Sequence, residues 1–215
     1  IQYIKMEENL GISGNSNRAL QAAKGAYVAL LDHDDVLTED ALYWVVDALQ
    51  RERYDVVYSD EDRMAENGSH YLEPRFKPEF DIDLLRAYNY ISHLFVARRE
   101  LMLADGGFHS QYDGAQGYDM ILRCCEDRRE ICHIPRVLYH KRIHDGTSSE
   151  REAKHAQENL AGKEALEAHV SREHLLARVM MTDQRSVYAV KYDTPGNPLV
   201  SMIITGHTNR SLMEQ

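Results

Sequence analysis

The feature that most constrains the fold is a continuous apolar run, residues 26–31, that stops abruptly at an acidic cluster. Asp32, His33, Asp34 and Asp35 follow this run directly. Unbroken apolar runs of this length are typical of strands that helices cover on both faces. We therefore predict a buried central strand at 26–31. The acidic cluster would lie at its carboxyl end, where open α/β sheets bind their ligands.

The rest of the chain alternates between strand and helix patterns, which predicts an α/β fold with a largely parallel sheet. Thr38 precedes an amphipathic segment and is expected to cap a helix over 38–53. Its inward face is expected to carry Ala41, Leu42, Val45, Val46 and Leu49. The other expected elements are strands over 1–6, 55–59, 91–97, 131–139 and 186–192, a helix that follows the loop 9–15 and ends at Gly25, a turn or helix over 99–104, helices over 118–127 and 150–172, and irregular structure over 60–90.

The chemistry of the acidic cluster leaves two interpretations open. Neighbouring carboxylates repel one another unless a cation or solvent screens their charge. Hard oxygen ligands on a short loop suit Mg²⁺ or Mn²⁺, and these ions keep coordination positions open for substrate phosphates. The alternative is a solvated acidic turn before the helix that starts near Thr38. The residues favour the metal site.

Composition narrows the classes of partner. The 215 residues carry 25 Lys and Arg against 35 Asp and Glu, a formal net charge of −10. This balance argues against nucleic-acid binding, which depends on cationic side chains at phosphates. The three cysteines lack the spacing of metal sites, so we expect reduced thiols and a cytoplasmic protein. No apolar run is long enough to span a membrane, although peripheral association with its inner face stays open.

Short segments that follow one another in a fixed order stand out over about the first 150 residues. They are Asn9–Asn17, Ala22–Tyr27, Leu30–Asp35, Tyr58–Asp62, Phe76–Pro78, Asn89–Leu94, Gly106–Phe108, Gly117–Asp119 and Pro135–His144. This ordered set resembles the family 2 glycosyltransferases, in particular those of polysaccharide and O-antigen synthesis. The resemblance is far more specific than the acidic cluster alone.

The resemblance implies a GT-A fold, a Rossmann-like mixed sheet flanked by helices. It also implies transfer of a sugar from a UDP- or dTDP-linked donor to a glycan or lipid-linked glycan. Asp32 and Asp34 match the metal-binding DxD motif, with Asp35 beside them. Asp34 is then the first choice as direct ligand of Mn²⁺ or Mg²⁺, and Asp32 is either a second ligand or a contact of the sugar or ribose.

The same resemblance assigns roles farther along the chain. Asp119 matches the general base of inverting members, although a helix N-terminal carboxylate is an alternative reading. His140, and after it His144, lie in the segment that supplies a further metal ligand, and Arg142 could pair with phosphate oxygens. A basic surface loop is the alternative for these three residues.

Two further places are assigned to the acceptor region. Asp60 and Asp62 belong to a second acidic segment, which we expect to be a turn that contacts the acceptor or structures a loop. A second metal site is the less favoured alternative for this segment. His93 is expected to be a loop histidine or an acceptor contact.

A non-catalytic carbohydrate-binding or assembly module is the alternative function. A nucleotidyltransferase is disfavoured, because no glycine-rich phosphate loop with Lys or Arg follows a strand.

Relatives open with two further strands that bind the nucleotide base, and nothing before Ile1 supplies them. We therefore expect a fragment of weak or no activity. Its parts would be 1–150, an incomplete GT-A domain, 151–197, a helical extension and linker, and 198–215, the opening strand of a second module. The apolar run 199–205 is expected to complete the sheet, within the chain or in a strand-exchanged homodimer.

Overall fold

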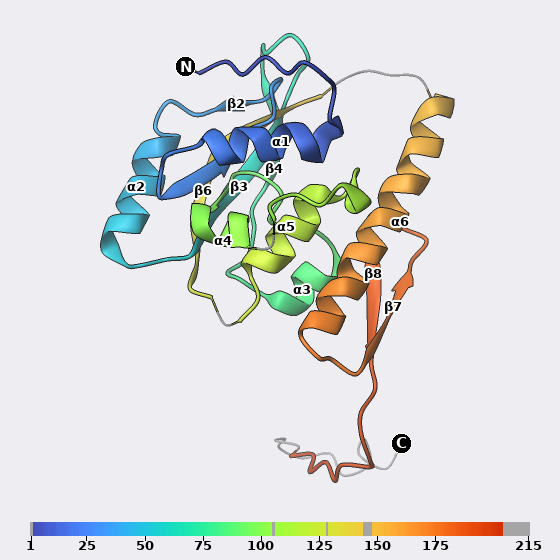
Figure 1. Ribbon diagram of the computed structural model, residues 1–215. Coiled ribbons are helices and arrows are strands. Elements are labelled where there is room, and N and C mark those ends of the chain that lie inside the picture. Colours follow the sequence, from blue (N-terminus) through green and yellow to red (C-terminus); the bar gives the residue numbers. More distant parts are fainter. Residues whose placement is uncertain (1, 105, 128, 144–147, 204–215) are drawn as a thin grey trace.

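The structure is a computed structural model that describes residues 2–104, 106–127, 129–143 and 148–203, without the side chains of 148–154 (Figure 1). Its elements are α1 (Gly11–Ala22), β1 (Tyr27–Leu30), β2 (Val36–Leu37), α2 (Ala41–Arg51), β3 (Val56–Met64), β4 (Tyr71–Arg75), α3 (Ile82–Ala87), β5 (Phe95–Arg98), α4 (Arg99–Ala104), the 3₁₀ helix η1 (Ser110–Tyr112), α5 (Gln116–Cys124), β6 (Ile131–Arg142), α6 (Ser148–Arg172), β7 (Ala177–Met181) and β8 (Tyr188–Tyr192).

The main sheet has the strand order β1-β5-β3-β6-β2, and β4 pairs with β3 beside this row. The predicted mixed sheet flanked by helices is confirmed. The narrower prediction of a largely parallel sheet is wrong, because β3 and β6 form the parallel pair and the other described pairs are antiparallel. The difference arises at β5, which inserts between β1 and β3 in the opposite direction to both.

The core lies on both faces of the sheet because side chains alternate along each strand. Val56 and Tyr58 of β3 face a cluster that includes α5 and α6. Val57, between them, faces a second cluster that includes Ala41 and Val45 of α2. These β3 side chains are almost fully buried, so β3 occupies the central position that the sequence suggested for 26–31.

The 26–31 run itself is an edge strand among the described residues. β1 pairs with β5 alone and is only partly buried. Leu31 lies beyond the strand and is 51% exposed. The prediction of a buried central strand was therefore wrong in position, since an apolar run does not distinguish a central strand from an edge strand that one helical layer covers.

Other boundaries also differ from the predictions. The first described residues, 2–6, form no strand. The helix expected from Thr38 begins at Ala41, and the Thr38 hydroxyl donates to Asp40 instead of capping the helix. Ala41 and Val45 are buried as predicted, but Leu42 and Val46 are 62% and 50% exposed, so they point outward. The segment expected to be irregular contains the end of β3, all of β4 and α3.

The C-terminal extension consists of α6 and the hairpin of β7 and β8, which lie beside α5 and α3 (Figure 1). Buried Leu166 and Val170 of α6 join the same core cluster as α5. Leu199–Ile203 form no strand and are exposed. These residues therefore do not complete the sheet within this chain, and 204 and 205 lie outside the described residues.

Candidate functional site

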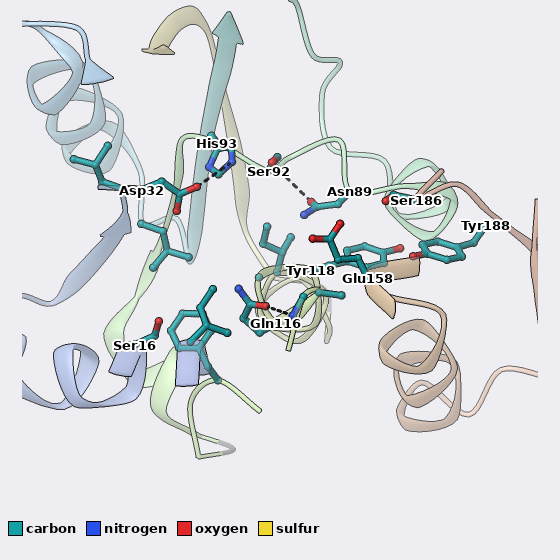
Figure 2. Close-up of a pocket in the computed structure, with 18 residues that line it drawn as sticks. Ser16, Asp32, Asn89, Ser92, His93, Gln116, Tyr118, Glu158, Ser186 and Tyr188 are labelled. Carbon is teal, nitrogen blue, oxygen red and sulfur yellow. Dashed lines mark hydrogen bonds and ion pairs between the residues drawn. The ribbon is translucent and has the colours of Figure 1, made fainter. Parts of the chain in front are cut away.

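A cavity of about 380 Å³ opens at the carboxyl end of β1, between the acidic loop and the C-terminal extension (Figure 2). Asp32 and His93 lie on one side of it, and Glu158, Ser186 and Tyr188 lie on the other. Its remaining lining comes from Ile12, Ser16, Leu30, Leu31, Asn89, Ser92, Phe108, Ile121 and residues 114–118. The cavity is therefore built from both the sheet and the extension.

The acidic loop is held to β6 by hydrogen bonds. The Tyr139 hydroxyl donates to Asp35 Oδ2 at 2.6 Å, and the Arg142 backbone N–H donates to Asp35 Oδ1 at 2.8 Å. The Arg142 guanidinium donates to the carbonyl oxygens of Asp34 and Glu66. Asp32 contacts β6 through its backbone N–H, which donates to the Tyr139 hydroxyl. Arg142, predicted to bind phosphate, here fixes the loop that carries the carboxylates.

His93 faces Asp32 across the edge of the cavity, with its Nε2 atom 4.0 Å from Asp32 Oδ2. Its ring stacks on Tyr139 at 4.6 Å. Burial, and then the positive charges of Lys141 and Lys77, lower the pKa of His93 to about 3. The imidazole is therefore neutral at neutral pH and can offer a nitrogen lone pair.

Lys77 holds the loop that carries His93. Its buried ammonium group donates to the carbonyl oxygens of Ile91 and His93 and lies 3.5 Å from Glu61. Burial lowers the pKa of Lys77 to about 8, although Glu61 opposes that shift. Through Lys77, the Phe76–Pro78 segment therefore supports the side of the cavity that carries His93 and Asp32.

Asp32, Asp35 and His93 are the described residues whose ligand atoms converge, all lying within 4.8 Å of one another. Burial, followed by the Asp35 charge, raises the pKa of Asp32, as expected for carboxylates that share a small volume. A divalent cation would relieve this repulsion. Asp34 and His140, the predicted first-choice ligands, are not in this group, and His144 lies outside the described residues.

The second acidic segment is not the expected turn, because Asp60 and Asp62 lie within β3. Asp60 Oδ1 lies 2.8 Å from His133 Nε2 and also accepts the Lys77 backbone N–H. Asp62 Oδ1 lies 2.6 Å from His140 Nδ1. Both carboxylates are buried and do not line the cavity. These contacts join β3 to β6 and to the Lys77 segment.

Asp119 is fully buried on α5 and does not line the cavity. Its Oδ2 atom accepts two hydrogen bonds from Arg123 and lies 3.2 Å from His109 Nδ1. The Arg123 guanidinium also donates to the Gly107 carbonyl at 2.6 Å. Asp119 therefore fixes the glycine turn before η1 to α5, and its role as general base stays a prediction.

Three polar residues on the far wall of the cavity were not predicted from the sequence. Glu158, Ser186 and Tyr188 stand in no recognisable motif, and they follow Asp32 by more than a hundred residues. Their place depends on how α6 and the hairpin pack, which local patterns do not determine.

The sequence of this chain is similar to those of a known family and of several known proteins. The family described as Glycosyl transferase family 2 matches residues 1–103. The chain is 39% identical over 208 residues to uncharacterized protein y4gI of Sinorhizobium fredii, covering 95% of this chain and 23% of that protein. It is 37% identical over 191 residues to the O-antigen biosynthesis protein RfbC of Myxococcus xanthus, covering 88% of this chain and 15% of that protein. The chain thus spans less than a quarter of either relative.

The fold has relatives among solved structures. S. aureus TarS, residues 1–349, superposes with a TM-score of 0.52 at 19% identity, covering 73% of this chain and 46% of that one. In its complex with UDP-GlcNAc, TarS gives a TM-score of 0.51 at 18% identity, covering 71% and 46%. Within the described residues, no helix has the length and apolar character that crossing a bilayer requires. Residues 1–103 therefore match the model of glycosyl transferase family 2, and the chain has the GT-A glycosyltransferase fold.

Proposed function

We propose that this chain is part of a glycosyltransferase that binds a nucleotide-sugar at the Asp32 side of the cavity and passes the sugar to a glycan or lipid-linked glycan. The observation that carries this proposal is the convergence of Asp32, Asp35 and His93 at the cavity edge. The names of two similar proteins support it, since RfbC is an O-antigen biosynthesis protein and TarS was crystallised with UDP-GlcNAc. A UDP-linked sugar is the donor to test first.

The residues at the edge fit a divalent cation, with two carboxylates and one neutral imidazole. A mixed oxygen and nitrogen set suits Mn²⁺ better than Mg²⁺, which prefers oxygen ligands. When bound, the cation would neutralise charge on the departing diphosphate. Asp32 and Asp35 would hold it with His93. Asp34 and His140 remain proposed ligands of second choice. Asp34 is outside the converging group, and His140 already lies within hydrogen-bond distance of Asp62.

The transfer itself exchanges one bond for another. The acceptor hydroxyl oxygen bonds to the anomeric carbon, while the bond from that carbon to the diphosphate oxygen breaks. The electron pair of the broken bond leaves with the nucleoside diphosphate, and the hydroxyl proton passes to a general base. Asp119 and inversion of configuration are proposed from the family resemblance. The buried Asp119 Oδ1, which has no hydrogen-bond partner among the described residues, is the atom that would have to become accessible.

Calorimetric titration of the chain with UDP-GlcNAc, with and without Mn²⁺, tests the donor site. We expect binding that requires Mn²⁺ and that Asp32→Asn weakens at least tenfold, roughly 1.4 kcal/mol, because a cation ligand loses its charge. Asp183→Asn, an exposed change on the hairpin turn, is the matched control and should bind as the unaltered chain does. Binding of equal strength without metal would contradict the proposed site.

A non-catalytic carbohydrate-binding module is the second candidate, favoured by the burial of Asp119 away from the cavity. Product analysis on the longer protein separates the two, because the chain alone is expected to have weak or no activity. Release of UDP from UDP-GlcNAc by the longer protein would indicate transfer, whereas donor binding without turnover would favour the module. Release of pyrophosphate would instead indicate a nucleotidyltransferase.

We also propose that the chain works in the cytoplasm as one portion of a longer protein that builds a polysaccharide. The similarity to RfbC, of which the chain spans 15%, supports this. Fractionation of cells that express the longer protein would test the location.

A further inference from the structure

The far wall of the cavity is built by the C-terminal extension. Glu158 comes from α6, Ser186 from the turn before β8, and Tyr188 from the first position of β8 (Figure 2). The family match ends at residue 103, so this wall lies beyond the matched region. Asp32 and His93 lie on the opposite wall, so the two walls of the cavity carry different sets of polar side chains.

Close packing fixes this wall in place. A Cβ atom on Gly162 would lie 2.0 Å from the Tyr188 hydroxyl oxygen, so only glycine there leaves room for that ring. The Tyr188 hydroxyl donates to the Asn159 carbonyl, and the Ser186 backbone N–H donates to the Asn159 side chain at 2.9 Å. Gly114, with φ of +99°, likewise allows close approach of Glu158 to the turn before α5.

The polar groups on this wall suit a sugar. The Glu158 carboxylate accepts from Arg185 at 2.9 Å and lies 3.1 Å from His155 Nδ1, which orients it. The rings of Tyr118 and Tyr188 stack with centroids 6.1 Å apart and 9° between their planes. A pocket that combines apolar ring surface with a few oriented polar groups is the usual form of a small-molecule site.

Charge decides the class of ligand. Asp32 and Glu158 are the carboxylates among the described lining residues, and no Lys or Arg is among them. Arg185 is already paired with Glu158, so a negatively charged sugar would find no cation to pair with among these lining residues. The hydroxyl groups of a neutral sugar can instead donate to the carboxylate oxygen atoms of Glu158.

We propose that Glu158, Ser186 and Tyr188 form the acceptor subsite and that Glu158 binds hydroxyl groups of a neutral acceptor sugar. This inference rests on the proposed glycosyltransferase function. It assigns donor binding to the family-matched part of the chain and acceptor recognition to α6 and the hairpin.

Two-dimensional ¹H–¹⁵N NMR on the 215-residue chain tests the subsite with four probes, the methyl glycosides of glucose, galactose, rhamnose and N-acetylglucosamine. Each is titrated with UDP and Mn²⁺ present. At least one should shift the amide signals of Glu158, Ser186 and Tyr188. Glu158→Gln, which keeps the shape but removes the charge, should weaken that binding at least fivefold. Glu167→Gln, on the same helix but outside the cavity, should not change it.

The outcomes separate this proposal from the proposed function. If UDP and Mn²⁺ do not bind the unaltered chain, the donor site fails. If they bind but no glycoside shifts the three amide signals, or if Glu158→Gln binds as well as Glu167→Gln, the acceptor subsite is overturned. A melting temperature within a few degrees of the unaltered chain shows that each variant is folded. The amide shifts of the unaltered chain decide the question if Glu158→Gln does not fold.

Discussion

At the residue scale, Lys77 shows how one buried cation can shape a site that it does not line. Its ammonium group supports the backbone on which His93 stands, and it compensates the buried Glu61 carboxylate. Both side chains are almost completely buried. The position of His93 beside Asp32 therefore depends on a residue that does not line the cavity.

Replacing Lys77 with Met should destabilise the chain by about 2–4 kcal/mol, because Glu61 and two carbonyl oxygens lose a buried donor. Equilibrium unfolding in urea measures this loss. Lys191→Met, an exposed change on β8, should stay within about 0.5 kcal/mol of the unaltered chain. Equal stability of the two variants would show that the Lys77 contacts contribute little.

Residue patterns predicted which carboxylates stand out, but they did not predict which histidines contact them. Asp32 and Asp35 were found because carboxylates directly after a strand end stand out in the sequence. Asp60 and Asp62 also stood out, yet their partners His133 and His140 lie 73 and 78 residues away. Nothing local distinguishes a carboxylate that awaits a cation from one that a distant histidine already contacts.

At the scale of elements, helices and strands with long, regular patterns were predicted best. The 25-residue α6 and the strand β6 were expected close to where they lie. The short β4 and β7 were missed, because their patterns are weak and pairing with a neighbouring strand determines them. The direction of β5 could not be read either, since a strand pattern is the same in both directions.

The contact between α5 and α6 should weaken in acid. The Glu126 carboxylate, just after α5, accepts from Arg172 and lies 2.7 Å from His169 Nδ1. Burial raises the pKa of Glu126, but hydrogen bonds from His169 and Arg172 outweigh it and leave the pKa below its ordinary value of 4.5. The folded state therefore gains stability from this group above about pH 4.5 and loses it as the pH falls through the lowered pKa.

Thermal unfolding of the unaltered chain and of Glu126→Gln between pH 3 and pH 7 (roughly the range in which carboxylates titrate) checks this expectation. The difference in melting temperature should be largest near neutral pH and should shrink below pH 4.5. A difference that stays constant over the whole range would mean that ionisation of Glu126 does not stabilise the contact.

At the scale of the whole molecule, the outer edge of β1 and the exposed residues 199–203 are two parts that could pair with one another. β1 lies at the end of the strand order, and in the described part of the chain its outer edge pairs with nothing. Residues 199–203 are exposed and mostly apolar, with Leu199 at 97%. Unpaired strand edges readily accept a further strand. These two features support the predicted exchange of strands between two chains.

Light scattering on the full chain and on residues 1–197 tests this exchange. The full chain should form a dimer at micromolar concentration, and the shortened chain should be a monomer, because the segment that pairs with the second copy is missing. As a control, Arg178→Ala alters an exposed ion pair on the hairpin and should leave the dimer intact. Equal masses for the full and shortened chains would exclude the exchange through this segment.

The division of the cavity between two consecutive stretches of the chain has an evolutionary consequence. The Asp32 wall is complete by the end of β6, and the Glu158 wall begins with α6. A crossover between related genes at the junction of β6 and α6 would therefore exchange the second wall as a unit and leave the first unchanged. Under the proposed division of roles, such recombination would change which acceptor is recognised and would leave donor binding unaltered.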